Sequence, residues 1–230
     1  MKCLLIKNAD VYAPQPLGIV DILIINDKIA KIGQQLAAPQ GLDCQILDAQ
    51  KRKVVPGYVD QHVHIIGGGG ESGPYSRTPE INLSELTKVG ITTVVGVLGT
   101  DGTSRHNESL LAKARGLTHE GITAYMLTGS YEIPLHNMTG DVRRDIILIN
   151  ECLGIGEVAL SDHRSSQPTR EELEKVLTQA RLGGMLSGKA GVVQFHMGVG
   201  KRGMDVLLAI VRETEIPFYP HPRQPCLPSF

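Results

Sequence analysis

Short apolar runs, separated by polar and turn-forming residues, fill the first 55 residues, and no stretch of useful length there has the period of a helix. These runs predict strands over 4–6, 20–25, 28–32 and 44–47. Asn26-Asp27 is a turn-favouring pair, so the second and third strands are expected to form a hairpin. Residues 1–55 are therefore predicted to be a small β domain, half of a sandwich-like arrangement, which needs a partner layer to bury its apolar face.

From Pro56 onward, continuous apolar runs alternate with amphipathic ones. The apolar runs predict strands that begin near residues 58, 92, 123, 157, 192 and 216. The amphipathic runs predict helices over 81–89, 108–120, 142–151, 170–182 and 205–213. Such alternation predicts a parallel sheet covered by helices, and the spacing of about 30 residues is that of a (β/α)8 barrel.

The length of the chain conflicts with a closed barrel. Residues 56–220 hold about five and a half βα units, and six strands cannot close a barrel that needs eight. A doubly wound open sheet would fit the length, whereas the side chains at the strand ends favour the barrel. The predicted fold class is therefore α/β, an incomplete (β/α)8 TIM barrel preceded by a small N-terminal β domain.

Composition excludes several classes of protein. The 230 residues are 41% hydrophobic and 20% charged, which argues against disorder. Lys and Arg number 23 against 24 Asp and Glu, so no basic surplus favours a nucleic-acid or anionic-membrane partner. The four cysteines form no CxxC pair and are predicted to be unpaired thiols of a reducing compartment. Without a signal-peptide core or an 18-residue apolar run, a cytoplasmic protein is expected.

The first strand of the second segment ends in a histidine pair. Asp60, His62 and His64 share one face of that strand because side chains alternate along it. Two imidazoles at positions i and i+2 can reach one metal ion, and the alternative is two histidines on an exposed strand. The position of the pair, between an apolar strand and a glycine-rich loop, favours a metal site.

The glycine-rich loop is Gly67-Gly68-Gly69-Gly70-Glu71. It is not a phosphate-binding loop, because no Gly-Lys-Ser/Thr follows it. A flexible surface loop is one interpretation. The other is that the glycines let the backbone approach a ligand while Glu71 presents a carboxylate to a cationic group.

Two later strands carry further candidates. Glu157 lies early in an apolar strand, where a buried carboxylate needs a metal or cation beside it unless it stands at the solvated lip. Arg164 can form a bidentate pair with a substrate carboxylate or a structural ion pair. His196 ends the fifth strand, where it is either a core residue or, in company with the histidine pair, a third imidazole ligand.

These residues resemble a known family. The segment PGYVDQHVH resembles the opening motif of the amidohydrolase superfamily. More narrowly, the chain is similar to the isoaspartyl (β-aspartyl) dipeptidases from about Leu4 to Pro220. The segments that carry this resemblance are DQHVHIIGGGGESGP, RTPE, GVLGTDGTSRH, MLTGSYEIP, SDHRSSQP and FHMG.

The resemblance implies a binuclear zinc hydrolase that cleaves the peptide bond after an N-terminal isoaspartyl residue, using a zinc-bridged hydroxide. By motif, His62 and His64 would hold the more buried zinc and His196 the second. Glu157 stands where the family pattern has a carboxylated lysine that bridges the two metals. A glutamate supplies the same bridging carboxylate on a shorter arm.

The resemblance also implies how an isoaspartyl dipeptide would bind. Glu71 would take the free α-amino group, and Arg164 a substrate carboxylate. Tyr131 would stabilise the developing oxyanion. Gly69, Gly70 and Thr100 would line the pocket. The family also implies a homo-oligomer, with no nucleic-acid or membrane partner.

The last ten residues depart from the family pattern. The family continues with Thr-His-Val-Asn-Arg on strand six and a general-base Asp on strand eight, whereas this sequence continues with His221-Pro222-Arg223. One codon choice for this segment encodes the family motif when it is read one base later. Residues 221–230 are therefore predicted to be a frameshifted, non-family tail, and the chain as given is expected to be inactive. The alternatives are another amidohydrolase, such as a cyclic amidase or an N-acyl-amino-acid deacetylase, and a catalytically dead scaffold.

Overall fold

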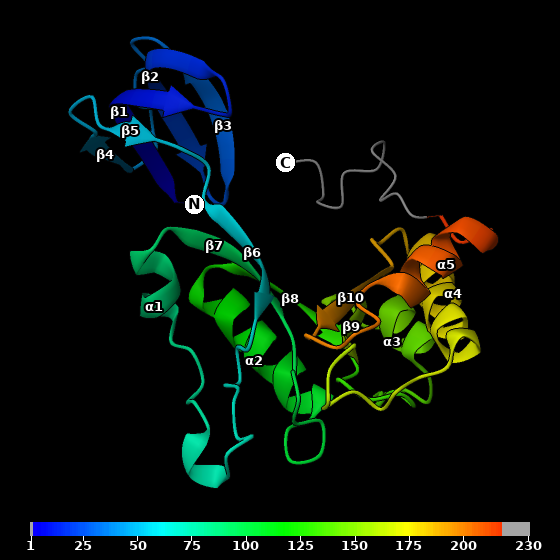
Figure 1. The fold of residues 1–230 in the computed structure, drawn as a ribbon. Coiled ribbons are helices and arrows are strands. Elements are labelled where there is room, and N and C mark those ends of the chain that lie inside the picture. The colour runs from blue at the N-terminus through cyan, green and yellow to red at the C-terminus, as the bar shows by residue number, and fades with distance from the viewer. Residues whose placement is uncertain (1, 218–230) are drawn as a thin grey trace. The chain divides into compact units, whose positions relative to one another are not determined.

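The computed structural model describes residues 2–217, which divide into two units between Gly57 and Tyr58 (Figure 1). The N-terminal unit is a five-stranded sheet in the order β3-β2-β1-β4, with β5 paired to β1. Its strands are β1 (Cys3–Tyr12), β2 (Pro16–Ile25), β3 (Lys28–Gly33), β4 (Cys44–Asp48) and β5 (Lys53–Val54).

The predicted hairpin is present. Strands β2 and β3 are antiparallel, and Ile25 pairs with Lys28 across the Asn26-Asp27 turn, where Asn26 has a φ of 57°. Ala9, Val11, Val20 and Ile22 are buried together as the core of this sheet. Strand β1 is longer than predicted because a register shift between Ile6 and Ala9 lets its pairing with β2 continue past the polar Lys7-Asn8.

The prediction of four unpaired thiols is wrong for two of them. Cys3 and Cys44 form a disulfide between β1 and β4. The parallel register of these strands places the two residues directly opposite each other, a proximity that their sequence separation of 41 conceals. Cys152 is a free, buried cysteine, and burial raises the pKa of its thiol to about 12. Cys226 lies outside the described residues.

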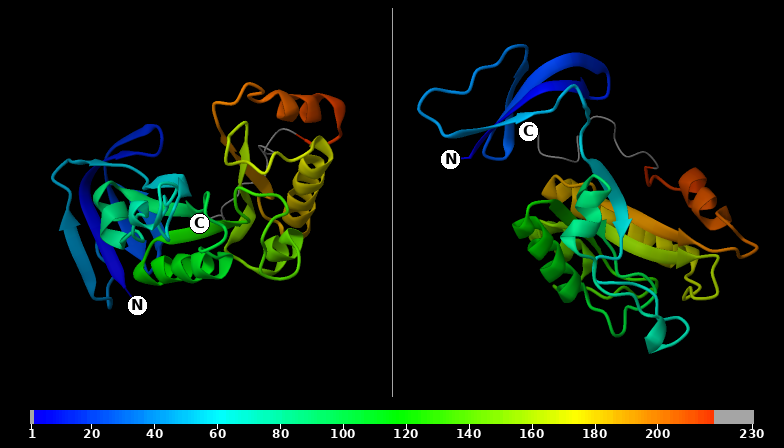
Figure 2. Two further views of the ribbon diagram at one scale, coloured as in Figure 1. Left: turned by 60° about the horizontal axis from the view of Figure 1, so that its bottom comes forward. Right: turned by 90° about the vertical axis from the view of Figure 1, so that its left-hand side faces the viewer.

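The second unit is built on a parallel sheet in the order β10-β9-β8-β7-β6, which curls as in half of a barrel (Figure 2). Its strands are β6 (Tyr58–Val63), β7 (Ile91–Gly96), β8 (Thr123–Thr128), β9 (Cys152–Leu160) and β10 (Val192–Met197). The α-helices are α1 (Leu83–Lys88), α2 (Asn107–Glu120), α3 (Val142–Leu148), α4 (Arg170–Ser187) and α5 (Asp205–Glu213), and a 3-10 turn spans Pro74–Ser76. The prediction of an incomplete (β/α)8 barrel after a small β domain is confirmed.

The helices cover one face of this sheet and share one core with it (Figure 1). Leu110 and Leu117 of α2, Ile146 of α3 and Leu173 of α4 are almost fully buried there. Local signals set both ends of α4. The helix begins at a capping box in which the side chain of Thr169 accepts a hydrogen bond from the backbone amide of Glu172, and it ends at Gly188, which has the left-handed conformation. The polar candidate residues therefore lie on the other face of the sheet and at the C-terminal ends of its strands.

Several boundaries differ from the predictions, and α4 runs to Ser187, five residues past its predicted end. Strand β9 begins at Cys152, five residues early, and α3 ends at Leu148, because residues 149–151, predicted as the end of that helix, form a turn that leads into the strand. The predicted sixth strand from Ile216, and the predicted tail over 221–230, reach into residues that lie outside the described range. In residues 2–217 no helix is long and apolar enough to span a membrane.

Candidate metal centre and substrate pocket

The candidate ligands come from strands that are not neighbours in the sheet. His62 is on β6 and Glu157 on β9, with β7 and β8 between them. The curl of the sheet nevertheless brings His62 Nε2 to 3.4 Å from Glu157 Oε2, and His64 Nε2 to 3.8 Å from Glu157 Oε1. In residues 2–217, His62, His64 and Glu157 form a group whose potential ligand atoms all lie within 4.8 Å of one another.

The surroundings of Glu157 fit a divalent cation. Its side chain is only 3% exposed, and imidazole nitrogens of His62, His64 and His196 lie 3.4 to 3.9 Å from its oxygens. These separations are too long for hydrogen bonds and suit atoms that share one ion, since zinc binds imidazole nitrogen and carboxylate oxygen at about 2.0–2.2 Å. Burial lowers the pKa of His64 despite the attraction of Glu157, which favours the neutral imidazole that a metal requires.

His196 reaches this group from β10, and its ring contacts the side chains of Tyr131, Asp162 and Arg164. Its Nδ1 lies 3.9 Å from Glu157 Oε2 and 2.8 Å from the hydroxyl of Tyr131. Its Nε2 lies 2.9 Å from Asp162 Oδ2. Nε2 thus faces both the acceptor Asp162 and the donor Arg164, 3.0 Å away, while Nδ1 faces Tyr131 and Glu157. The sequence analysis missed Asp162, although its place at the end of β9, beside Arg164, was a usable signal.

Glu71 and Arg164, the two predicted binders of substrate charge, contact each other. Arg164 Nη1 lies 3.2 Å from Glu71 Oε1, and the Thr100 hydroxyl donates to the same oxygen at 2.9 Å. Hydrogen bonds from the backbone amide of Glu71 and from the hydroxyl of Thr100 lower the pKa of the Glu71 carboxyl group. Arg164 also pairs with Asp162 at 2.9 Å. The carboxylate of Glu71 and the guanidinium of Arg164 therefore lie side by side, next to the candidate metal ligands.

Tyr131 lies just after β8, and only 4% of it is exposed. Burial, followed by the charge of Glu157, raises the pKa of its phenol to about 12. The hydroxyl therefore keeps its proton near neutral pH and can donate a hydrogen bond. The guanidinium of Arg164 stacks over the Tyr131 ring, with its Cζ atom 5.3 Å from the ring centroid.

The glycine-rich loop is held in a conformation that needs glycine. Gly67 has a φ of 80°, and a Cβ there would lie 2.2 Å from the carbonyl oxygen of Thr78. Arg105, a guanidinium only 4% exposed, donates to the carbonyls of Gly68 and Gly69 at 2.8 and 3.1 Å. A cavity of about 220 Å³ lies against this loop. Its lining includes the predicted substrate residues Gly69, Gly70, Glu71 and Thr100, together with Pro74, Arg77, Asp101 and Ser104.

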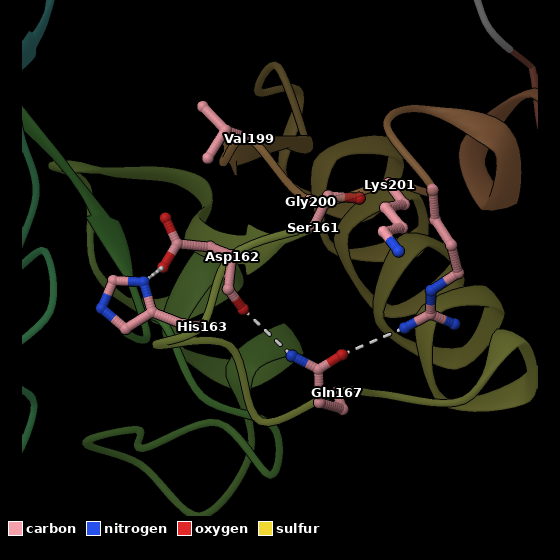
Figure 3. A pocket seen from close by; sticks show the side chains of 8 residues that line it. Ser161, Asp162, His163, Gln167, Val199, Gly200 and Lys201 are labelled. Atoms are coloured by element: carbon pink, nitrogen blue, oxygen red, sulfur yellow. Dashed lines mark hydrogen bonds and ion pairs between the residues drawn. The ribbon is translucent and has the colours of Figure 1, made fainter.

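Figure 3 shows a second cavity, of about 410 Å³, between the loops that follow β9 and β10. Gln167 braces it, because its amide donates to the carbonyl of Asp162 and accepts from Arg202. Its lining residues are Ser161, Asp162, His163, Gln167, Val199, Gly200, Lys201 and Arg202. Asp162 thus lies between this cavity and His196.

Comparison with solved structures shows a close relative. The chain superposes on β-aspartyl dipeptidase from Fervidobacterium islandicum AW-1 with a TM-score of 0.89 and 46% identity, over 94% of this chain and 59% of that one. A second structure of that enzyme, in complex with β-Asp-Leu dipeptide, matches with the same score and identity, over 94% of this chain and 56% of that one. The chain thus spans less than two-thirds of both. D-hydantoinase from Thermus sp., at 20% identity and a TM-score of 0.57, shares the fold.

Curated proteins match over shorter segments. Imidazolonepropionase of Psychromonas ingrahamii is 27% identical over 119 residues, which are 50% of this chain and 30% of that protein. Dihydroorotase of Staphylococcus aureus strain MRSA252 is 39% identical over 90 residues, which are 39% of this chain and 20% of that protein. No family model matches the sequence. Together, the comparisons confirm the resemblance of this chain to the β-aspartyl dipeptidases and, more broadly, to the amidohydrolase superfamily.

Proposed function

We propose that the protein is a metal-dependent dipeptidase that hydrolyses the peptide bond after an N-terminal isoaspartyl residue. The observation that carries this proposal is the 46% identity to a β-aspartyl dipeptidase over 94% of the chain. The polar candidates gathered at the C-terminal ends of the parallel strands support it, because barrel enzymes build their active sites there.

His62, His64, Glu157 and His196 would hold the metal, which we propose to be two zinc ions. Bound zinc would polarise the scissile carbonyl and lower the pKa of water. The chain's own contribution is to hold three imidazoles and one buried carboxylate within reach of a common centre. Glu157 itself is shielded from bulk water, whereas the imidazoles of His62 and His64 remain about one-third exposed.

The adjacent charges of Glu71 and Arg164 suit the head of an isoaspartyl substrate. In such a substrate the free α-ammonium and the free α-carboxylate are bonded to the same carbon, so opposite charges must be received a short distance apart. Glu71 would accept the ammonium and Arg164 would bind the carboxylate, in place of their mutual contact at 3.2 Å. In an ordinary α-peptide the α-carboxyl group is part of the peptide bond, so Arg164 would have no α-carboxylate to bind.

Tyr131 would act on the scissile carbonyl. Its phenol is protonated near neutral pH because burial raises its pKa to about 12, and it lies at the edge of the proposed metal group. A hydrogen bond from this hydroxyl would stabilise negative charge that develops on the carbonyl oxygen. Thr100 and the backbone of Gly69 and Gly70 would shape the pocket around the peptide.

The test is hydrolysis of β-Asp-Leu, with α-Asp-Leu, dihydroorotate and an N-acyl amino acid as competing substrates. We expect little turnover from the 230-residue chain, because the strand-eight aspartate of the family pattern has no counterpart in it. A chimera that continues residues 1–217 with the remainder of the Fervidobacterium enzyme should hydrolyse β-Asp-Leu in preference to the others. A chimera that melts cooperatively and binds zinc, yet does not cleave β-Asp-Leu, would contradict the proposal.

A further inference from the structure

Gln194 on β10 contacts a candidate metal ligand from the opposite edge of the sheet. Its side-chain Nε2 lies 2.9 Å from Nδ1 of His62, which is on β6. Strand alternation places Gln194 on the same face as His196, while Phe195 between them packs against the core on the helix side. Gly156 on the neighbouring strand leaves room for it, since a Cβ there would lie 3.0 Å from the Cβ of Gln194.

The proton on the His62 ring decides whether that residue can bind a metal. Its Nε2 faces Glu157 at 3.4 Å and must carry a lone pair to act as a ligand. The neutral ring then carries its proton on Nδ1, and that N–H needs an acceptor. A carboxamide has one, its oxygen, and a half-turn about its last bond exchanges oxygen and nitrogen without changing the volume it fills.

The oxygen of Gln194 is otherwise unused. Oε1 is buried and has no hydrogen-bond partner among residues 2–217, while the Nε2 of the amide faces the His62 nitrogen that would carry the proton. We propose that Gln194 is a positioning residue: its Oε1 accepts the Nδ1–H of His62 and leaves Nε2 free to bind a divalent metal beside Glu157. This inference deepens the proposed metal centre and rests on it.

A second imidazole of the site also has an acceptor beside the nitrogen that points away from Glu157. Asp162 Oδ2 lies 2.9 Å from Nε2 of His196, where Arg164 Nη2 also lies at 3.0 Å, and Nδ1 of that ring faces Glu157. An acceptor on the far nitrogen thus orients a ring whose near nitrogen faces the shared carboxylate, as is usual for metal-binding histidines. Gln194 supplies this acceptor for His62, whereas Nδ1 of His64 is buried with no hydrogen-bond partner in the described part of the chain.

Two variants separate the acceptor from the rest of the side chain. Gln194→Glu keeps an acceptor and loses the donor, whereas Gln194→Met loses both at similar volume. We expect Gln194→Met to weaken zinc binding about 10- to 100-fold and Gln194→Glu to bind zinc at least as tightly as the wild type, measured by competition with a chromogenic chelator. The exposed Gln45 gives the control, and Gln45→Met should leave zinc affinity unchanged.

Nitrogen-15 NMR of the metal-free chain, with His62 assigned by comparison with His62→Ala, supplies a readout that does not depend on zinc. We expect the Nδ1-protonated form of His62 in the wild type and in Gln194→Glu, and a mixture of tautomers in Gln194→Met. An Nε2-protonated His62 in the wild type, or a Gln194→Met chain that binds zinc as tightly as the wild type, would overturn the proposal. Absence of zinc binding by a wild-type chain that has the expected tautomer would instead contradict the metal centre.

Discussion

The carboxylate of Asp162 is held by the guanidinium of Arg164, two residues later in the chain, through Nη2–Oδ2 and Nε–Oδ1 contacts of 2.9 and 3.0 Å. The same carboxylate contacts His196, and the same guanidinium contacts Glu71. One ion pair therefore links the proposed metal ligands to the proposed substrate-binding residues. Its integrity has consequences for both stability and binding.

Asp162→Asn should lower the free energy of unfolding of the zinc-free chain at pH 7 by about 1–3 kcal/mol, because it removes charge-assisted hydrogen bonds. The hydrogen-bonded Arg164 lowers the pKa of Asp162 in the folded state. Its stabilising effect is therefore present above the unfolded-state pKa of about 3.9 and is lost as pH falls below that value. Urea unfolding should show the difference between wild type and variant shrinking from pH 6 to pH 3.

Asp43, an exposed acid of the N-terminal unit, provides the control for that series. Asp43→Asn should change the free energy of unfolding by less than about 0.5 kcal/mol at any pH in the series. A difference between wild type and Asp162→Asn that stays constant from pH 6 to pH 3 would argue against the ion pair as its source.

Glu157→Gln should have opposite effects with and without zinc. In the metal-free chain, the variant removes a carboxylate that is 3% exposed and has no Lys or Arg partner among residues 2–217, so the free energy of unfolding should stay level or rise by about 1 kcal/mol. Zinc at about 100 times its Kd should stabilise the wild type by about 2.7 kcal/mol and the variant far less. Urea unfolding with a chelator and urea unfolding with zinc measure the two effects. An equal zinc-dependent rise in the free energy of unfolding of wild type and variant would contradict a ligand role for Glu157.

The architecture could be predicted because it depends on local patterns. Apolar strands and amphipathic helices alternate with the spacing of the barrel unit, so the start of β6 and both ends of α5 were predicted where the structure has them. The histidine pair and the glycine-rich loop were found in the same way, since each is a short motif at a strand end. That the strand ends meet follows from the parallel sheet alone.

Contacts between distant segments could not be predicted. The Cys3–Cys44 disulfide depends on the register of β1 against β4, which no local pattern fixes. The contact of Gln194 with His62 depends on the curl of the sheet across five strands, and Gln194 in an apolar strand is the only local sign of it. The orienting role of Asp162 follows from the position of His196, 34 residues away.

Tyr131 should not ionise until well above the range of ordinary tyrosines. Burial raises the pKa of its phenol to about 12, because the phenolate would lose solvation, and the negative charge of Glu157 adds to the effect. The chain has six tyrosines, and the ultraviolet phenolate signal of wild type and Tyr131→Phe should coincide up to about pH 11. A wild-type signal that exceeds that of the variant near pH 10, where ordinary tyrosines titrate, would show that Tyr131 is accessible.

Arg105 should control the order of the glycine-rich loop. Its buried guanidinium donates to the carbonyls of Gly68 and Gly69, and a methionine in its place leaves both without their donor. Arg105→Met should therefore cost about 1–3 kcal/mol of unfolding free energy, and the amides of residues 67–71 should exchange hydrogen faster than in the wild type. Arg115, in an exposed pair with Glu151, is the control, since Arg115→Met should cost less than about 1 kcal/mol and leave loop exchange unchanged. Equal exchange in wild type and Arg105→Met would show that the loop keeps its conformation through its glycines and the contact of Thr78 alone.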